Sequence, residues 1–132
     1  MANAAVLVAD DDAPVRATLI KFLKSLGVQE ILEASNGVEA VERVKATPHL
    51  KLILLDLKMP VQDGLKTLEL IRAINPTVEI VILTGYPFYG EADQVVQKHR
   101  VMDFTVKPVD LDYLERIIGA ALSGKTPPPK TP

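Results

Sequence analysis

Ala5-Val6-Leu7-Val8-Ala9 is an unbroken apolar run, and three carboxylates, Asp10-Asp11-Asp12, follow it without a gap. Apolar runs that do not alternate with polar residues are typical of parallel strands covered by helices on both faces. Two later runs, Leu52-Ile53-Leu54-Leu55 and Ile80-Val81-Ile82-Leu83, have the same character. These three segments are therefore predicted to be the central strands of a parallel sheet.

The rest of the chain predicts two further strands and a series of helices. The segments at residues 30–34 and 103–106 are short and mixed in polarity, which favours edge strands. Asp12 and Pro14 are typical of a helix start, and Gly27 of a helix end. Alternation of strand and helix predicts an open, doubly wound α/β domain. Apolar spacing predicts helices at about 14–26, 37–47, 63–74, 92–98 and 111–122, of which the fourth has only one clear apolar pair.

The composition is that of a single globular domain. The chain has 132 residues, 48% hydrophobic and 24% charged, with a formal net charge of -2. It has no basic cluster for a nucleic-acid backbone, and no apolar run long enough to cross a membrane. It also has no cysteine, which excludes disulfides and thiol chemistry and is compatible with a reducing cytoplasm. We therefore expect a cytoplasmic domain that binds neither nucleic acid nor membrane.

The C-terminal residues differ from the rest. Residues 124–132 hold four of the ten prolines and no aliphatic or aromatic side chain. Such a segment favours an extended, polyproline-like conformation. We therefore expect a folded domain at 1–123 and a proline-rich tail or linker at 124–132, which is either a tether to an output domain or a solvated end.

Charged residues stand where the predicted strands end. Asp10 and Asp11 follow the first strand, Asp56 follows the third, and Lys107 follows the last. The carboxyl ends of parallel strands meet at one edge of a sheet, so these side chains are expected to converge. Crowded carboxylates need a compensating charge, which a hard divalent cation such as Mg²⁺ and the lysine ammonium can supply. The chemistry implied is phosphoryl transfer onto a carboxylate.

The order and spacing of these residues also carry a family resemblance. Over residues 4 to about 122 the chain resembles the receiver domain of bacterial two-component response regulators. The resemblance implies a flavodoxin-like (βα)5 fold with strand order 2-1-3-4-5, which would place the two weak strands outermost. The motifs that carry it are Val8-Ala9-Asp10-Asp11-Asp12, Leu55-Asp56-Leu57-Lys58-Met59-Pro60, Asp63-Gly64, Leu83-Thr84-Gly85-Tyr86 and Val106-Lys107-Pro108.

The resemblance assigns a role to each carboxylate. Asp56 would be the phosphoacceptor, taking a phosphoryl group from a histidine kinase or a histidine phosphotransfer protein. Asp10 and Asp11 would position Mg²⁺ or Mn²⁺ together with Asp56 and the backbone carbonyl of Lys58. In the family the second acidic residue binds the cation directly and the first usually acts through water. The domain would then catalyse only its own phosphorylation and dephosphorylation, and would not be an enzyme in the usual sense.

The resemblance also implies a conformational switch. Thr84 and Lys107 would bind the phosphoryl group, and Phe104 would rotate with Thr84 to change the surface offered to a partner protein or output domain. Lys58 and Tyr86 occupy positions that tune the phosphoryl lifetime. A second copy of the chain is a further candidate partner after phosphorylation.

Other interpretations of the sequence remain open. The main alternative is a receiver-like docking module that works without phosphorylation. A flavin- or nucleotide-binding protein would need a loop rich in Gly, Ser or Thr after the first strand, where this chain has carboxylates. A phosphoester hydrolase would need an acidic residue at Lys58. His49 and His99 lack neighbouring catalytic motifs and are expected to be surface or loop residues, and Arg100 stands where receiver domains often have glycine.

Overall fold

The computed structural model describes residues 4–57, 64–84, 97–107 and 109–123. These residues form a five-stranded sheet in the order β2-β1-β3-β4-β5, with all neighbouring strands parallel. The predicted α/β class, the strand order and the edge positions of the two weak strands are confirmed. The strands are β1 (Ala5–Ala9), β2 (Glu30–Ala34), β3 (Leu50–Leu55), β4 (Glu79–Thr84) and β5 (Asp103–Val106).

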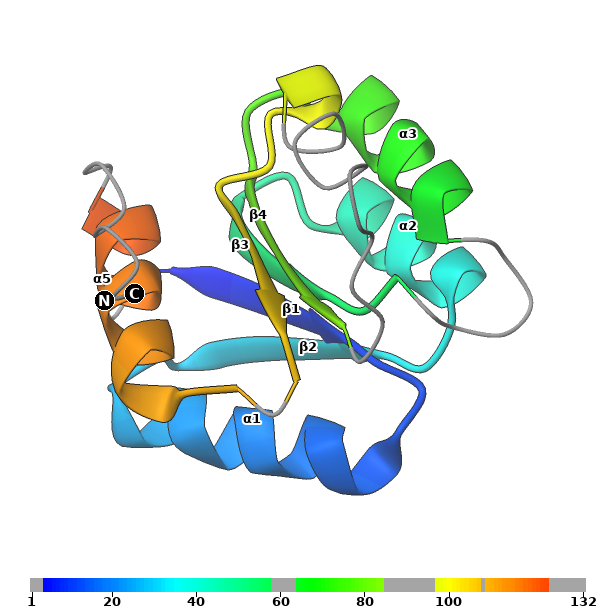
Figure 1. The fold of residues 1–132 in the computed structure, drawn as a ribbon. Coiled ribbons are helices and arrows are strands. Elements are labelled where there is room, and N and C mark those ends of the chain that lie inside the picture. The colour runs from blue at the N-terminus through cyan, green and yellow to red at the C-terminus, as the bar shows by residue number, and fades with distance from the viewer. Residues whose placement is uncertain (1–3, 58–63, 85–96, 108, 124–132) are drawn as a thin grey trace.

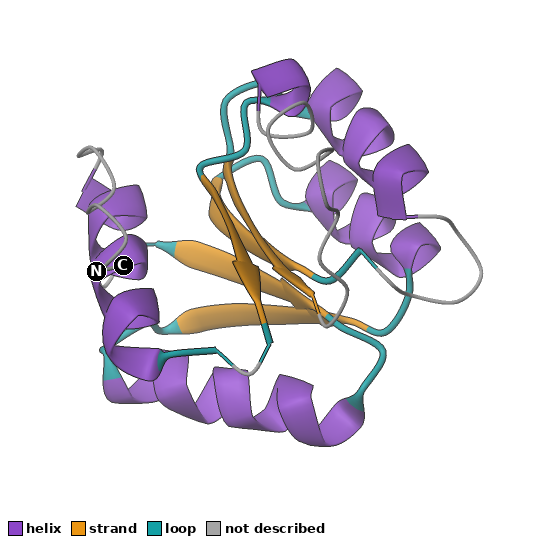
Figure 2. Ribbon diagram, viewed as in Figure 1, coloured by secondary structure: helices purple, strands orange, loops and turns teal. Residues whose placement is uncertain are grey.

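Helices cover both faces of the sheet. One face carries α1 (Ala13–Ser25) and α5 (Leu111–Ser123), and the other carries α2 (Gly37–Ala46) and α3 (Gly64–Ile74) (Figures 1 and 2). The predicted helix around 92–98 lies mostly outside the described residues, although residues 97–99 are helical. Among the described helices, none has the length and apolar character needed to cross a bilayer.

The sheet separates two hydrophobic cores. Within β1, Leu7 packs into the core beneath α2 and α3, whereas Val6 and Val8 pack into the core beneath α1 and α5. Successive strand residues point to opposite faces, so a strand covered on both faces must be apolar at every position. This burial explains the unbroken apolar runs of the three central strands.

Side-chain caps fix where the first two helices begin. The Asp12 carboxylate accepts a hydrogen bond from the Val15 amide at 3.2 Å, and the Asn36 side chain accepts one from the Glu39 amide at 2.9 Å. The Glu39 carboxylate in turn accepts from the Ser35 amide at 2.7 Å, which helps to lower its pKa. The predicted helix starts are therefore confirmed, with the mechanism expected for these residue types.

One prediction about the histidines was wrong. His49 is exposed and its Nε2 lies 2.8 Å from the Glu30 carboxylate, but His99 is buried, with 9% of its surface accessible. Burial is the main cause that lowers the pKa of His99.

The next residue, Arg100, has a left-handed backbone with φ of 53°. This conformation is unusual for a residue other than glycine, because the Cβ atom crowds the backbone there.

Candidate functional site

Two buried aspartates lie side by side at the carboxyl edge of the sheet. Ala9 and Leu55, the last residues of β1 and β3, are paired in register, and Asp10 and Asp56 follow them. The Asp56 amide continues this pairing by donating to the Ala9 carbonyl at 2.9 Å. Asp10 is 2% and Asp56 5% exposed. Two carboxylates this deeply buried require nearby positive charge or hydrogen-bond donors.

Asp11 completes a cluster of three carboxylates. An oxygen from each of Asp10, Asp11 and Asp56 lies within 4.8 Å of the other two. Asp11 is exposed, so the cluster opens to solvent on its side. An all-oxygen, anionic donor set that is partly open to water is the kind that Mg²⁺ prefers. The described residues therefore fit a divalent cation.

Lys107 supplies positive charge to this cluster. Its Nζ donates to Asp10 Oδ2 at 2.6 Å and to Asp56 Oδ2 at 3.3 Å. Burial alone would lower the lysine pKa, but the hydrogen bonds and charges of the two aspartates raise the pKa of Lys107 above its usual value. The ammonium therefore stays protonated and partly neutralises both buried carboxylates.

Asp10 is held from several directions. Its Oδ1 accepts from the Asp12 amide at 2.9 Å, its Oδ2 accepts from Lys107, and its own amide donates to the Ala34 carbonyl at 3.1 Å. Both carboxylate oxygens of Asp10 therefore already have donors, whereas Asp11 is turned toward solvent. This asymmetry separates a positioning carboxylate from one that is accessible to an ion.

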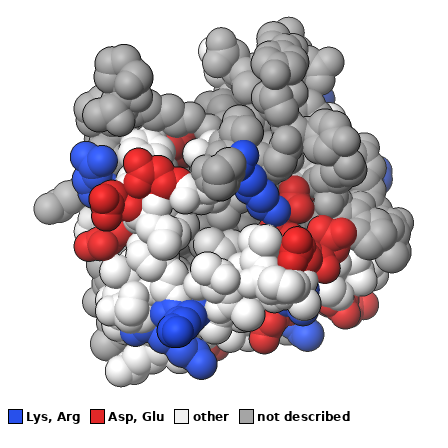
Figure 3. All heavy atoms as spheres, turned by 60° about the horizontal axis from the view of Figure 1, so that its bottom comes forward, with Lys and Arg blue, Asp and Glu red and all other residues white. Residues whose placement is uncertain are grey.

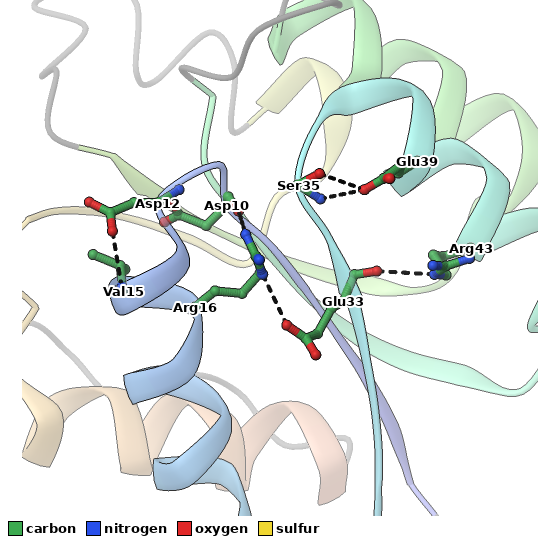
Figure 4. A network of polar contacts seen from close by, with 8 residues as sticks. All are labelled: Asp10, Asp12, Val15, Arg16, Glu33, Ser35, Glu39 and Arg43. Atoms are coloured by element: carbon green, nitrogen blue, oxygen red, sulfur yellow. Dashed lines mark hydrogen bonds and ion pairs between the residues drawn. The ribbon is translucent and has the colours of Figure 1, made fainter.

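Arg16 is a site residue that the sequence pattern did not predict. From the first turns of α1, its Nη1 donates to the Asp10 carbonyl at 2.8 Å and its Nε to Glu33 Oε1 at 3.0 Å (Figure 4). Arg43 on α2 donates to the carbonyl of the same Glu33 at 3.0 Å. The only sequence signal was a basic residue just after the acidic turn, which is equally typical of a solvent-exposed helix face.

The remaining predicted site residues are described only in part. Thr84 is the last residue of β4, in register with Val106, and Phe104 lies in β5 opposite Ile82. Thr84 is therefore at the same edge of the sheet as the aspartates. The predictions for the carbonyl of Lys58 and the ring of Tyr86 fall on positions outside the described residues.

An apolar groove borders the charged cluster. It has a volume of about 580 Å³ and is lined by α1 residues, by Leu83 and Lys107, and by Val109 and Leu111. Leu111 is 42% exposed although it is aliphatic. Figure 3, in which the side of the molecule that carries α1 comes forward, shows two groups of acidic side chains, a basic side chain beside one of them, and uncharged surface between and below them.

Comparison with known proteins identifies the class. The family model of the response regulator receiver domain matches residues 6–119, so this chain belongs to that family. Receiver domains are the phosphoacceptor switches of two-component signalling, and are regulatory domains rather than enzymes acting on a separate substrate. They bind Mg²⁺ at an acidic pocket and interact with histidine kinases and output domains.

Individual relatives agree with this class. The transcriptional regulatory protein ZraR of Klebsiella oxytoca is 33% identical over 118 residues, which are 89% of this chain and 26% of ZraR. A response regulator receiver domain protein from Clostridium thermocellum has a TM-score of 0.83 at 26% identity, covering 92% of this chain and 95% of that one. A response regulator protein from Burkholderia pseudomallei, solved with a phosphorylated aspartic acid, a calcium ion and citrate, has a TM-score of 0.77 at 28% identity. The match to it covers 91% of this chain and 66% of that one. The chain spans only about a quarter of the length of ZraR.

Proposed function

We propose that Asp56 accepts the phosphoryl group and that Asp10 and Asp11 hold the cation that assists the transfer. The observation that carries this proposal is the convergence of the three carboxylates within 4.8 Å, with Lys107 bonded to two of them. An aspartic acid is also the phosphorylated residue in the Burkholderia relative, whose structure holds a calcium ion. Among the three, Asp56 follows the middle strand of the sheet, β3, and so stands between Asp10, which follows β1, and Thr84 at the end of β4.

The three carboxylates would divide the work of holding the cation. Asp11 is exposed and would bind Mg²⁺ or Mn²⁺ directly, together with Asp56 and the backbone carbonyl of Lys58. Asp10, whose two oxygens already accept hydrogen bonds, would act through water. When bound, the cation offsets the negative charge of the carboxylates and of the incoming phosphoryl oxygens.

The remaining chemistry falls to side chains of the chain itself. Attack by Asp56 on phosphorus brings two anions together, so the site needs positive charge and alignment more than a strong base. Lys107 already lies against Asp56 and can turn its ammonium to a phosphoryl oxygen. Thr84, at the end of β4, would donate a hydrogen bond from its hydroxyl to another phosphoryl oxygen.

The same two side chains would drive the switch. Moving an equilibrium from 1:99 to 99:1 takes about 5.5 kcal/mol of differential interaction. Charge-assisted hydrogen bonds contribute about 1.5 to 3 kcal/mol each, so new bonds from Thr84 and Lys107 supply most of this energy. Rotation of Phe104 would carry the change to the surface, and Lys58 and Tyr86 would set how long the phosphoryl group survives.

The phosphodonor would be a histidine kinase or histidine phosphotransfer protein that approaches along the groove. A donor histidine must come within bonding distance of Asp56, so the surface of the donor must border Lys107. Leu111, which is exposed, and Lys107 both line this groove. Leu111→Glu should slow phosphorylation by a protein donor about tenfold, because apolar contact is lost. It should leave phosphorylation by acetyl phosphate unchanged.

The proposal also includes the domain boundaries, the cellular location and the partners of the domain. Residues 1–123 form the receiver domain and 124–132 a tail or linker to an output domain or partner, in the cytoplasm. A second copy of the chain is a further candidate partner once Asp56 is phosphorylated.

Intact mass spectrometry after incubation with acetyl phosphate and Mg²⁺ tests the central claim. The wild type should gain the mass of one phosphoryl group, and Asp56→Asn and chelated samples should gain none. Asp103→Asn, on β5, is the matched control and should be phosphorylated normally. A phosphoryl group that persists in Asp56→Asn would overturn the assignment, and no incorporation in the wild type would favour a docking module that works without phosphorylation.

A further inference from the structure

Arg16 contacts the backbone that carries the acidic cluster, whereas Lys107 contacts the carboxylates of Asp10 and Asp56. Its guanidinium donates to the carbonyl of Asp10, not to the carboxylate, and holds Glu33 with a second nitrogen. Its side chain is 18% exposed, so most of it is packed. Arg16 therefore links the end of β1 to the neighbouring edge strand β2.

We infer that Arg16 is a positioning residue for cation binding, and this inference rests on the proposed function of the site. By fixing the Asp10 carbonyl, Arg16 orients the peptide between Asp10 and Asp11, which carries Asp11 toward the cation. The Asp10 carboxylate is fixed separately by the Asp12 amide and Lys107. The turn that presents Asp11 is thus anchored on both sides.

The planar fork of arginine suits this task. One guanidinium can donate in two fixed directions, so it bridges a carbonyl and a carboxylate on different strands. A lysine ammonium at the end of a flexible chain can satisfy either acceptor but does not impose the angle between them. Arg43 belongs to the same network through its bond to the carbonyl of Glu33, whereas the bond to the Asp10 carbonyl comes from Arg16 (Figure 4).

Charge and positioning predict opposite effects when Arg16 is neutralised. A positive charge near the cluster repels a divalent cation, so its removal should tighten binding if charge alone mattered. Removal of a group that orients metal ligands typically weakens metal binding by a factor of about ten or more. The sign of the change in Mg²⁺ affinity therefore separates the two roles.

Calorimetric titration of the unphosphorylated chain with Mg²⁺ provides the measurement. We expect Arg16→Gln to raise the Mg²⁺ dissociation constant about tenfold and Arg16→Lys, which keeps the charge, to raise it less. Arg43→Gln makes the same change of charge nearby and should alter the constant less than about twofold. Urea unfolding in EDTA shows whether each variant is folded, and Arg16→Lys serves if Arg16→Gln is not.

Phosphorylation kinetics give a second readout. With acetyl phosphate as donor, the Mg²⁺ concentration for half-maximal rate should rise about tenfold in Arg16→Gln, while the rate at saturating Mg²⁺ changes little. Unchanged or tighter Mg²⁺ binding in Arg16→Gln, with binding still lost in Asp11→Ala, would overturn the role of Arg16 alone. Absence of Mg²⁺ binding in the wild type would overturn the proposed cation site and the role of Arg16 with it.

Discussion

A partly buried basic side chain lies at each end of the strands, one at the carboxyl edge of the sheet and one at the amino edge. The surroundings compensate its positive charge in a different way at each edge. At the carboxyl edge, Lys107 lies between the carboxylates of Asp10 and Asp56. At the amino edge, Arg72 from the end of α3 hydrogen-bonds to backbone carbonyls. Its guanidinium donates to the carbonyls of Asn75, Val78, His99 and Arg100 at 2.6 to 3.3 Å.

The pKa values of the two cations shift in opposite directions. Burial lowers the pKa of Arg72, and the charge of Arg100 adds to the effect against a smaller opposing contribution from Glu79. Burial has the same tendency at Lys107, but two carboxylates in contact reverse it. A lysine paired with carboxylates can give up these partners to a metal ion or turn to a phosphoryl group. An arginine bonded to backbone carbonyls instead holds the fold together. The carboxyl edge is therefore suited to switching, and the amino edge to holding the α3–β4 turn against the start of β5.

Removal of the arginine at the amino edge should have the largest effect. Arg72→Met removes four hydrogen bonds and leaves carbonyls without their donors, so we expect the free energy of unfolding to fall by about 3 kcal/mol. Urea unfolding in EDTA measures it, with Arg43→Met as the control at an exposed arginine. The Mg²⁺ dissociation constant of the folded protein should not change. A change in that constant would contradict the separation of the two edges.

Removal of the lysine at the carboxyl edge should instead change ion binding. In Lys107→Gln no ammonium competes with Mg²⁺ for Asp10 and Asp56, so the Mg²⁺ dissociation constant should fall roughly tenfold, or about 1.4 kcal/mol. This is opposite in sign to the change expected for Arg16→Gln, which loses an anchor and not a competitor. Calorimetric titration tests both, and Lys98→Gln provides the same charge change at the amino edge. Weaker binding in Lys107→Gln would mean that the lysine organises the carboxylates.

A smaller effect is expected at the strained backbone of Arg100. Glycine adopts its φ of 53° without a Cβ penalty, but it also gains entropy in the unfolded chain. We expect Arg100→Gly to be more stable than Arg100→Ala by about 0.5 kcal/mol in urea unfolding. Both variants lack the charge of Arg100, so the difference between their stabilities reports on the backbone conformation alone. Equal stabilities would show that the conformation is not strained.

The smallest effect concerns pH. Burial, aided by Lys98 and opposed by Glu69, lowers the pKa of His99, so the folded state disfavours the protonated ring. The stability that comes from the neutral His99 ring is then fully present above the pKa of the unfolded histidine, near 6.5. It is lost as the pH drops through the folded pKa. Unfolding measured between pH 7.5 and 5.5 should show this decline in the wild type and in His49→Gln but a flatter profile in His99→Gln. An identical profile in all three would exclude His99 as its source.

Local patterns in the sequence were enough to predict most of the fold. Continuous apolar runs follow directly from burial on both faces, and Asp12 and Asn36 cap helices through contacts only three residues away. The convergence of Asp10, Asp11 and Asp56 was also predictable, because parallel strands bring their carboxyl ends together whatever the details of packing. The class of fold and the set of carboxylates therefore follow from local sequence patterns.

The pairing of the charges around these carboxylates, in contrast, depends on long-range contacts. Lys107 and Asp10 are 97 residues apart, and their contact depends on strand register and on the reach of the lysine side chain. The direction of Arg16 toward a carbonyl, the burial of His99 and the four partners of Arg72 likewise depend on how helices seat against neighbouring strands. A sequence pattern records which faces are buried, because burial is periodic along the chain. It does not record which of several nearby acceptors a long cationic side chain meets, because that choice depends on distances set by the whole fold.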